Sequence, residues 1–580
     1  MGDGAGGRRR ASGRRGAGLR AAGRPGSRHH WRGLDGRIRL VRLLVLVVFV
    51  LIGSRAVALA ASSDLSERAQ QQQTRVVELP AHRGAILDRS GRELAVGTPQ
   101  QTVYAAPSLL DDPIAATGDL CTALEIKRRK DKLALLEALS NKKSGFAYVA
   151  RKADPDLAKA ALALNLPGVG AYAEEARSYP GKGSAAQVIG YAGVDNHGLE
   201  GIEFKYDKEL AGRAGSQLVV RDPAGRLIKT ISRTEPVAGA DVTLTLDSDL
   251  QVYAEDVLKR TVRQTSAKGG VAVVMDPRSG QILALVNVPI VKDHDFGRWH
   301  KNATNAAVSN VYEPGSIFKM VTVAGALADG LVTPQSKFTL QSSIRVADRE
   351  INESHERGTV TYSVAEILQW SSNVGAVRIG QKMGEEGLYK WVKAFGFGQK
   401  SGVEFPNESA GIVPDVDAWS GSSIGNIPMG QGIAVTPLQM AAAVSTIAND
   451  GVAVTPKLVL RVGETRTSSS AGKRVIPVKV ARQVRRMLTK AVDAGTGTKA
   501  RIEGYKVAGK TGTSQKVVDG EYSRSLYVAS FAGMAPAAAP RVVVLVAVDE
   551  PRGSIYGGDV AAPAVQQIMG FALQHLEIAP

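Results

Sequence analysis

Cysteine is almost absent from this chain of 580 residues, in which Cys121 stands alone. A single cysteine forms no internal disulfide, which excludes a disulfide-stapled scaffold, and it cannot supply the several thiolates of a structural zinc site. We expect Cys121 to be a small buried hydrophobic residue. Apolar residues make up 44% of the chain, which excludes wholesale disorder as well as a collagen-like or coiled-coil protein.

A second long apolar run is also missing, which excludes a polytopic membrane protein. The one such run is residues 43–61, about the length that crosses a bilayer core, with Arg55 near its outer end. Residues 1–42 hold twelve arginines and only two acids, so the positive-inside rule predicts that they are cytoplasmic and that everything after about residue 61 lies outside. The alternative is a cleaved signal peptide with Ala58-Leu59-Ala60 as its cleavage site, although a 42-residue leader is long for one.

The basic excess is concentrated in this N-terminal tail. The net charge is +18, and residues 1–42 supply 12 − 2 = +10 of it. Binding of nucleic acid or anionic lipid is one interpretation of such a tail. A topology signal explains it together with the apolar run, so we expect a membrane and no nucleic acid as its partner.

Composition and periodicity divide the chain into four parts: a disordered Arg/Gly-rich tail (1–37), a transmembrane anchor (38–61), a mixed segment (62–229) and an α/β domain (230–580). In the last part we expect an antiparallel sheet split by a long helical insertion. The expected strands are Gly270–Met275, Gln281–Val286, Tyr505–Ala508, Tyr527–Met534 and Arg541–Val548. The expected helices are Ile317–Ala328, Val364–Met383, Pro437–Ala448, Ala481–Ala494 and Val560–Leu576, with Ala115–Leu139 and Asp154–Leu166 in the mixed segment.

The first motif with chemical meaning is Ser316-Ile317-Phe318-Lys319, which follows Pro314-Gly315. Pro-Gly interrupts the preceding segment, so Ser316 is expected at a helix N-terminus with Lys319 one turn along on the same face. A serine hydroxyl needs an adjacent base to act as a nucleophile, and a lysine with a lowered pKa can be that base. Two further S-x-x-K matches, Ser140–Lys143 and Ser470–Lys473, are expected to be a solvated pair and a loop.

Two more motifs follow in order. Ser371-Ser372-Asn373 lies within an expected helix, where a polar trio among apolar residues is costly unless its groups find partners. Lys510-Thr511-Gly512-Thr513 lies on an expected strand. Gly512 lets another backbone approach closely, and Lys510 with the threonine hydroxyls can bind a carboxylate. Alone, the first suggests a helix cap and the second an ordinary strand.

Together, S-x-x-K, S-x-N and K-T-G resemble the constellation of penicillin-binding proteins and β-lactamases. The chain resembles a class B penicillin-binding protein of the division-specific FtsI type over about residues 38–580. Gly402–Gly411 and the short C-terminal end favour that type over the elongation type. The segments that carry the resemblance to the family's pedestal are Arg83–Gly91, Arg177–Gly181 and Gly198–Glu203, and Tyr312–Lys319, Gly430–Gln439 and Ala508–Thr513 carry the resemblance to its transpeptidase domain.

The resemblance implies a pedestal (62–229), a transpeptidase domain (230–580), and acyl transfer on D-Ala–D-Ala stem peptides of peptidoglycan. It implies that Ser316 is the nucleophile, Lys319 the base, and Ser371 a proton relay to the leaving amine. It implies that Asn373 holds a substrate amide and orients Lys319, and that Lys510 shapes the electrostatic field of the site. It further implies that the strand Thr511-Gly512-Thr513 binds the terminal carboxylate of the substrate. It also implies an oxyanion hole of the Ser316 and Thr513 N–H groups, no metal or cofactor, inhibition by β-lactams, and a polytopic glycan polymerase with other division proteins as partners.

Several alternatives stay open. No second catalytic motif follows the membrane segment, which speaks against a bifunctional glycosyltransferase. A β-lactamase needs a deacylating carboxylate, for which Glu404 and Glu408 are candidates by position. An elongation-type enzyme, a β-lactam sensor and a mainly scaffolding protein are the others. His294 and His300, with Asp293 and Asp295, resemble a group of metal ligands but are expected in a surface loop. Asn352-Glu353-Ser354 is a chance match to a glycosylation pattern.

Overall fold

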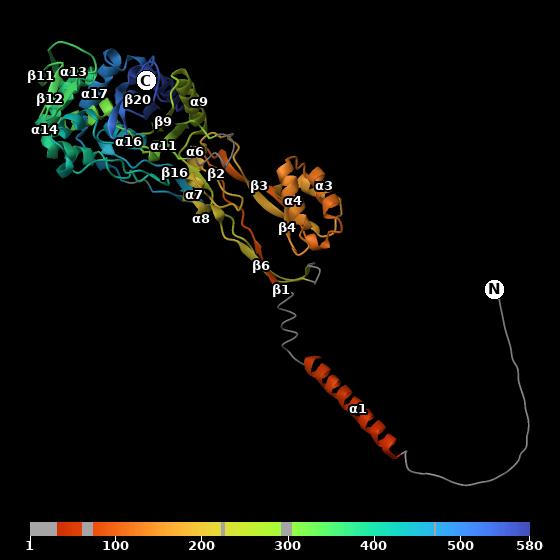
Figure 1. Ribbon diagram of the computed structural model, residues 1–580. Coiled ribbons are helices and arrows are strands. Elements are labelled where there is room, and N and C mark those ends of the chain that lie inside the picture. Colours follow the sequence, from red (N-terminus) through yellow and green to blue (C-terminus); the bar gives the residue numbers. More distant parts are fainter. Residues whose placement is uncertain (1–31, 61–73, 182, 222–226, 292–303, 469–470) are drawn as a thin grey trace, which may run out of the picture. The chain divides into compact units, whose positions relative to one another are not determined.

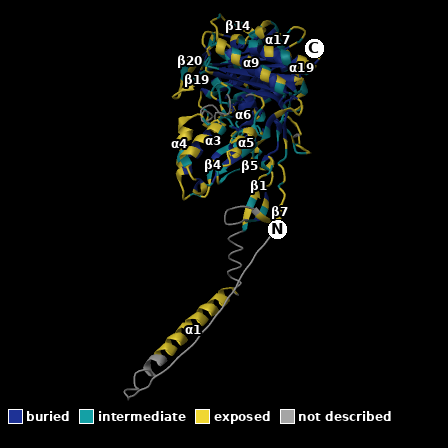
Figure 2. Ribbon diagram, turned by 90° about the vertical axis from the view of Figure 1, so that its right-hand side faces the viewer, coloured by how far each residue is buried: buried dark blue, intermediate teal, exposed yellow. Residues whose placement is uncertain are grey.

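The computed structural model describes residues 32–60, 74–181, 183–221, 227–291, 304–468 and 471–580, and these fall into two units (Figure 1). The first unit contains helix α1 (Arg32–Ala60) and a three-stranded sheet in the order β1 (Thr74–Leu79), β6 (Gly215–Arg221), β7 (Leu227–Thr234). Within α1, the segment Arg37–Ala60 has a mean hydropathy of 2.6 and is unburied, and among the described residues it alone is a helix long and apolar enough to cross a membrane. Figure 2 shows this exposure. One N-terminal apolar helix is therefore confirmed.

The second unit, residues 78–216 and 234–580, begins with a sheet that runs through both of its segments. Its order is β17-β16-β8-β2-β3-β4, and β5 pairs with β3. The bounds are β2 (Ile86–Leu87), β3 (Glu93–Ala105), β4 (Ala147–Ala153), β5 (Val169–Ser178), β8 (Val242–Leu244), β16 (Val459–Val462) and β17 (Thr465–Arg466). Because β2 and β8 pair in parallel, backbone hydrogen bonds join residues 78–216 to the C-terminal segment.

Helices cover one face of β3 and β4. They are α3 (Pro113–Ala123), α4 (Arg129–Ser140) and α5 (Pro155–Ala163), and their apolar side chains share one core with Val103 and Val149. The single helix expected over Ala115–Leu139 is thus two helices with a break between them. Cys121 is buried in this core as expected, and burial raises the pKa of its thiol.

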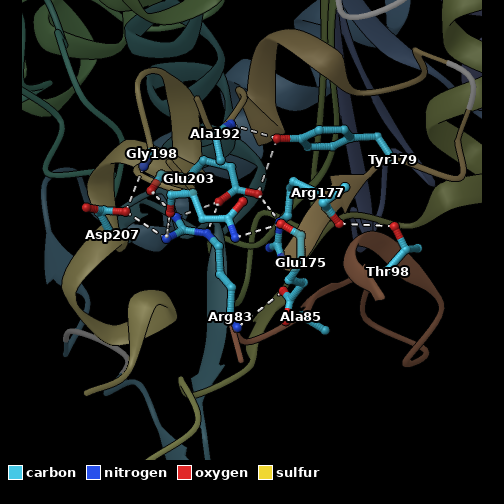
Figure 3. Close-up of polar contacts among 12 residues, drawn as sticks. Arg83, Ala85, Thr98, Glu175, Arg177, Tyr179, Ala192, Gly198, Glu203 and Asp207 are labelled. Atoms are coloured by element: carbon cyan, nitrogen blue, oxygen red, sulfur yellow. Dashed lines mark hydrogen bonds and ion pairs between the residues drawn. The ribbon is translucent and has the colours of Figure 1, made fainter. Parts of the chain in front are cut away.

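A buried cluster of charges joins the three segments that carry the resemblance to the pedestal (Figure 3). Arg83 donates from Nη2 to Glu203 Oε2 at 2.6 Å and from Nη1 to Asp207 Oδ1 at 2.7 Å. Arg177 donates from Nε to Glu203 Oε1 at 2.6 Å. The side chains of Arg83, Arg177 and Glu203 are at most 2% exposed. Buried charges are tolerated inside a protein when each of them lies within hydrogen-bond distance of an opposite charge.

The C-terminal segment is built on a five-stranded antiparallel sheet in the order β10-β9-β21-β20-β19. Side chains alternate between its faces, so Val271, Val273 and Met275 of β9 enter one core while Ala272 and Val274 enter the other. The bounds are β9 (Gly269–Met275), β10 (Ile282–Val288), β19 (Ala508–Val518), β20 (Glu521–Ala535) and β21 (Val542–Asp549).

Helices pack on both faces of this sheet, which lies in the dark blue interior in Figure 2. One face contacts α9 (Ser248–Gln264) and α19 (Ala562–His575), and the other contacts α12 (Lys319–Ala328), α16 (Pro437–Ala448) and α17 (Val478–Ala494). The expected fold class is therefore confirmed. Two expectations need correction: Tyr505–Val507 precede β19 instead of forming a strand, and the helix expected over Val364–Met383 is interrupted at residues 370–372.

Candidate active site

Ser316 lies in a tight turn at the start of a buried helix. Residues Gly315–Phe318 form a 3₁₀ turn, η2, that runs directly into α12. Gly315 has φ +54°, and a Cβ there would lie 3.0 Å from the carbonyl oxygen of Thr513, so the turn rests against β19. Ser316 is partly exposed and its Oγ makes no hydrogen bond among the described residues, whereas Lys319 is fully buried. The hydroxyl is thus available to an incoming group.

Ser371 and Ser372 lie in the break between α13 (Val364–Gln369) and α14 (Asn373–Ala394), and Asn373 is the first residue of α14. Ser371 has φ +61°, a left-handed conformation that costs energy in a residue other than glycine and is common at functional sites. Ser372 caps α14 by accepting a hydrogen bond from the N–H of Gly375. The trio therefore lies at a helix start and not within a continuous helix, and the break turns both the carbonyl and the hydroxyl of Ser371 toward the buried lysines.

The ammonium group of Lys319 meets oxygen atoms of this break. Its Nζ donates to the Ser371 carbonyl oxygen at 2.6 Å and to Asn373 Oδ1 at 2.6 Å, with Ser371 Oγ at 3.4 Å. No carboxylate of the described residues pairs with it. Burial lowers the pKa of Lys319 to about 7, against an opposing influence of Glu353. A lysine with that pKa is a competent base near neutral pH.

Lys510 approaches the same serine from β19. Its Nζ donates to Ser371 Oγ at 2.7 Å and to the carbonyl oxygen and Oγ1 of Thr511, both at 3.3 Å. Burial, with the nearby charge of Lys319, lowers the pKa of Lys510 well below its usual range. Burial acts on both lysines, so it does not by itself decide which of them loses a proton first.

The rest of the K-T-G strand packs closely against its surroundings. A Cβ on Gly512 would lie 2.3 Å from Ser530 Oγ and 2.9 Å from Ile317, so only glycine permits this contact between β19 and η2. Thr511 Oγ1 lies 3.0 Å from Thr496 Oγ1, and Thr513 Oγ1 accepts a hydrogen bond from the N–H of Gly557 at 3.2 Å. The structure thus brings Lys319, Ser371, Asn373 and Lys510 together by hydrogen bonds and places Ser316 on the turn beside β19.

The sequence analysis missed three residues that hold this arrangement. Asn352 accepts a hydrogen bond from Asn373 Nδ2 at 2.8 Å through its carbonyl oxygen. Glu353 accepts from the N–H of Asn373 at 2.8 Å, and Arg357 pairs with Glu353 at 2.5 Å. In the sequence, Asn352-Glu353-Ser354 matches only a glycosylation pattern. Its role was hidden because it depends on a pairing between residues about twenty positions apart.

Other candidates from the sequence lie outside the site. Glu404 accepts from the N–H of Leu458, and Glu408 accepts from the N–H groups of Ser401 and Gly402, so both carboxylates bind backbone in the described structure. Ser140 ends α4 and donates to the Leu136 carbonyl oxygen in an exposed position. Ser470, His294 and His300, with Asp293 and Asp295, lie outside the described residues.

Comparison of the sequence with those of known proteins identifies the family. Residues 270–570 match the family described as penicillin binding protein transpeptidase domain, and residues 78–244 match the penicillin-binding protein dimerisation domain. The chain is 34% identical to stage V sporulation protein D of Bacillus subtilis over 94% of its length and 86% of that protein. It is equally 34% identical to the peptidoglycan D,D-transpeptidase FtsI of Escherichia coli over 93% of its length and 91% of that protein.

Solved structures agree. Penicillin binding protein 3 from Mycobacterium tuberculosis, in complex with aztreonam, superimposes with a TM-score of 0.69 at 30% identity. That similarity covers 87% of this chain and 98% of the solved one. Penicillin binding protein 2X from Streptococcus thermophilus gives a TM-score of 0.72 at 23% identity, which supports the fold.

Proposed function

The chain belongs to the class B penicillin-binding proteins, which are peptidoglycan D,D-transpeptidases, and on that premise we propose that it cross-links stem peptides at the division septum through an acyl-enzyme on Ser316. The observation that carries the assignment of residues is the position of Lys319 Nζ, which lies 2.6 Å from both the Ser371 carbonyl oxygen and Asn373 Oδ1. Lys319 follows Ser316, the proposed nucleophile, by about one helical turn.

The hydrogen-bond pattern supports Lys319 as the base. The two closest partners of Lys319, both at 2.6 Å, can only accept, so a neutral amine satisfies them with its two N–H bonds. Its third partner, Ser371 Oγ at 3.4 Å, is a hydroxyl that can donate to the remaining lone pair. Lys510 donates to three oxygen atoms, the number that an ammonium group serves. We therefore assign the lone pair to Lys319 and the charge to Lys510.

The first half-reaction follows from this assignment. Ser316 Oγ attacks the carbonyl carbon between the two D-alanines, and its proton passes to the lone pair of Lys319. The N–H groups of Ser316 and Thr513 stabilise the oxyanion, and Thr511 and Thr513 hold the terminal carboxylate of the substrate with the help of the Lys510 charge. When the C–N bond breaks, Ser371 donates a proton to the departing D-Ala amine and is reprotonated from the lysines that it contacts.

The second half-reaction reverses the first with a new amine. The amino group of a neighbouring stem peptide attacks the ester carbonyl, its proton returns through Ser371 and Lys319, and the Ser316 hydroxyl is restored. The net result is one new amide bond and one free D-Ala. Neither half-reaction of this scheme draws on a metal or a redox cofactor.

The chemical proposal is tested with the purified full chain in detergent. It is incubated with a stem pentapeptide that ends in D-Ala–D-Ala and with an amine acceptor, and the products are separated by mass. We expect one D-Ala released for each cross-linked product, and none from a Ser316→Ala variant. Release of D-Ala in water without a cross-link would indicate a carboxypeptidase instead.

Assignment to division rests on the segment Gly402–Gly411. Depletion of this protein in its source bacterium should give filaments that grow without septa. Loss of cell shape without filaments would favour the elongation-type role. The partner that we propose is a polytopic glycan polymerase of the same membrane, which supplies the strands that Ser316 cross-links, together with other division proteins.

The membrane helix supports a proposal for orientation in the cytoplasmic membrane. Arginines at positions 37, 39 and 42 lie in the N-terminal part of α1, and the segment after them is apolar except for Ser54 and Arg55. By the positive-inside rule we expect the N-terminus in the cytoplasm. In spheroplasts, external protease should digest the chain after about residue 62 and spare residues 1–42. Recovery of a mature protein that starts at Ala61 would show a cleaved signal peptide.

A further inference from the structure

The start of α14 is held by a short segment that carries no recognised motif. Strand β13 (Arg349–Asn352) ends at Asn352, and Glu353 follows it directly. Glu353 Oε2 accepts from the N–H of Asn373 at 2.8 Å, while its Oε1 accepts from Ser372 Oγ at 2.5 Å and from the N–H of Val374 at 3.3 Å. A carboxylate at a helix N-terminus satisfies free N–H groups and interacts favourably with the helix dipole. Here it also fixes the position of Asn373.

The amide of Asn373 is oriented by the neighbouring residue. Its Nδ2 donates to the Asn352 carbonyl oxygen at 2.8 Å, which leaves Oδ1 to face Lys319. If the amide turned over, two donors would meet at Lys319 and two acceptors at Asn352. Asn352 and Glu353 therefore determine where Asn373 Oδ1 lies and what Lys319 can bind.

Glu353 is itself held from the other side. Arg357 Nη2 pairs with Glu353 Oε1 at 2.5 Å, and Arg357 Nη1 donates to the Leu340 and Gly358 carbonyl oxygens, both at 3.1 Å. The Arg357 guanidinium also lies 5.4 Å from the centre of the Tyr362 ring. The side chain of Glu353 is 6% exposed, so its charge is screened by protein groups more than by water.

We infer that Glu353 is a positioning residue of the transpeptidase reaction, which holds Asn373 against Lys319 from the start of α14 and whose buried charge acts on that lysine. This inference rests on the proposed role of Lys319. It adds to the proposed function a residue that never touches substrate but acts on the base through α14.

The sign of the charge effect follows from the groups around Lys319. Lys510 from β19 is a like charge, while Glu353, after β13, is the carboxylate that acts on Lys319 and favours its protonated form. Arg357 opposes Glu353, and Glu366 of α13 is engaged by Ser363 at the far end of that helix. Removing the charge of Glu353 should therefore make Lys319 lose its proton at a lower pH.

The test is the pH dependence of acylation in the full chain. The second-order rate constant for acylation by a fluorescent penicillin is measured from about pH 5 to about pH 9. Plotted against pH, this rate constant rises on the acid side to a plateau, and the midpoint is the pH at which it is half of the plateau value. For Glu353→Gln we expect the midpoint to move down by roughly half a unit to one unit. We also expect a lower plateau, because Gln cannot accept from all four donors.

A charge-conserving variant separates position from charge. Glu353→Asp keeps the negative charge on a shorter side chain, so we expect the midpoint of the wild-type protein and a plateau lowered between about tenfold and about a hundredfold. Glu350→Gln is the matched control: Glu350 lies on β13, just before Glu353, and is exposed, and its side chain bonds only to Ser343 among the described residues, so neither value should change.

A third variant predicts the opposite sign. Arg357→Gln removes the cation that opposes Glu353, so the midpoint should move up. If Glu353→Gln fails to fold, the midpoint of Arg357→Gln still tests the effect of the Glu353 charge. An unchanged midpoint in both Glu353→Gln and Arg357→Gln, with only the plateau altered, would reduce Glu353 to a structural helix cap. Absence of any penicillin adduct in the wild-type protein at every pH would overturn the proposed function itself.

Discussion

Two buried cations of the pedestal, Arg83 and Arg177, meet a carboxylate, whereas the two buried lysines of the active site, Lys319 and Lys510, meet none among the described residues. Arg83 and Arg177 lie 2.6 Å from oxygen atoms of Glu203. Lys319 and Lys510 meet hydroxyl, carbonyl and amide oxygens instead, and Glu353 is bonded to Arg357 and the start of α14. Paired charges stabilise a fold and stay as they are, whereas unpaired buried lysines lose protons easily and can move them. The two clusters thus separate stability from reactivity within one chain.

The largest effect should come from replacing the base. In Lys319→Arg the guanidinium cannot lose its proton near neutral pH, so we expect the rate constant for acylation by one β-lactam to fall by about a thousandfold or more. Lys143→Arg, in the exposed decoy motif, is the matched control and should acylate normally. If Lys319→Arg kept most of the rate, a water molecule or Ser371 would have to be the base.

The pedestal cluster should respond in stability instead. Glu203→Gln leaves Arg83 and Arg177 buried beside a neutral group, so we expect the free energy of unfolding to fall by about 3 to 5 kcal/mol. Thermal unfolding of the full chain measures this, with the exposed Glu209→Gln as the control. Acylation of the folded protein should change little. A large loss of acylation without a loss of stability would show that the two clusters are coupled.

A smaller effect is expected from Lys510→Arg, because the proposed role of Lys510 needs a positive charge and no proton transfer from a lone pair. We expect the acylation rate constant to fall on the order of tenfold, or ~1.4 kcal/mol in the activation free energy. The measurement is the same rate constant across pH. A loss as complete as that of Lys319→Arg would mean that the two lysines exchange roles or share one proton.

Local patterns predicted much of this molecule. Short apolar runs predicted β9, β10 and β21, the long apolar run predicted α1, and the helix expected over Pro437–Ala448 matches α16 to the residue. Three short motifs, through their resemblance to a family, indicated Ser316, Lys319, Ser371, Asn373 and Lys510. The break at residues 370–372 was missed because the apolar period continues across it, and the left-handed Ser371 leaves no trace in composition.

What the sequence did not reveal depends on contacts between distant residues. Glu353 bonds to Asn373 and Val374, and nothing near position 353 distinguishes it from Glu350 or Glu356 on a sequence basis. Likewise, Arg83 lies 120 residues before Glu203 and Arg177 lies 26 residues before it, and only folding brings their charges together. Such pairings follow from topology, and a single sequence does not display them.

The most direct test of this account is intact-protein mass spectrometry of the full chain after labelling with a fluorescent penicillin, followed by digestion to locate the adduct. We predict one stable adduct per chain on Ser316, complete loss of labelling in Ser316→Ala, and normal labelling in Ser140→Ala. An adduct on another residue would contradict the assignment of the nucleophile. An adduct that is hydrolysed within the time of labelling would contradict the transpeptidase account and point to a β-lactamase.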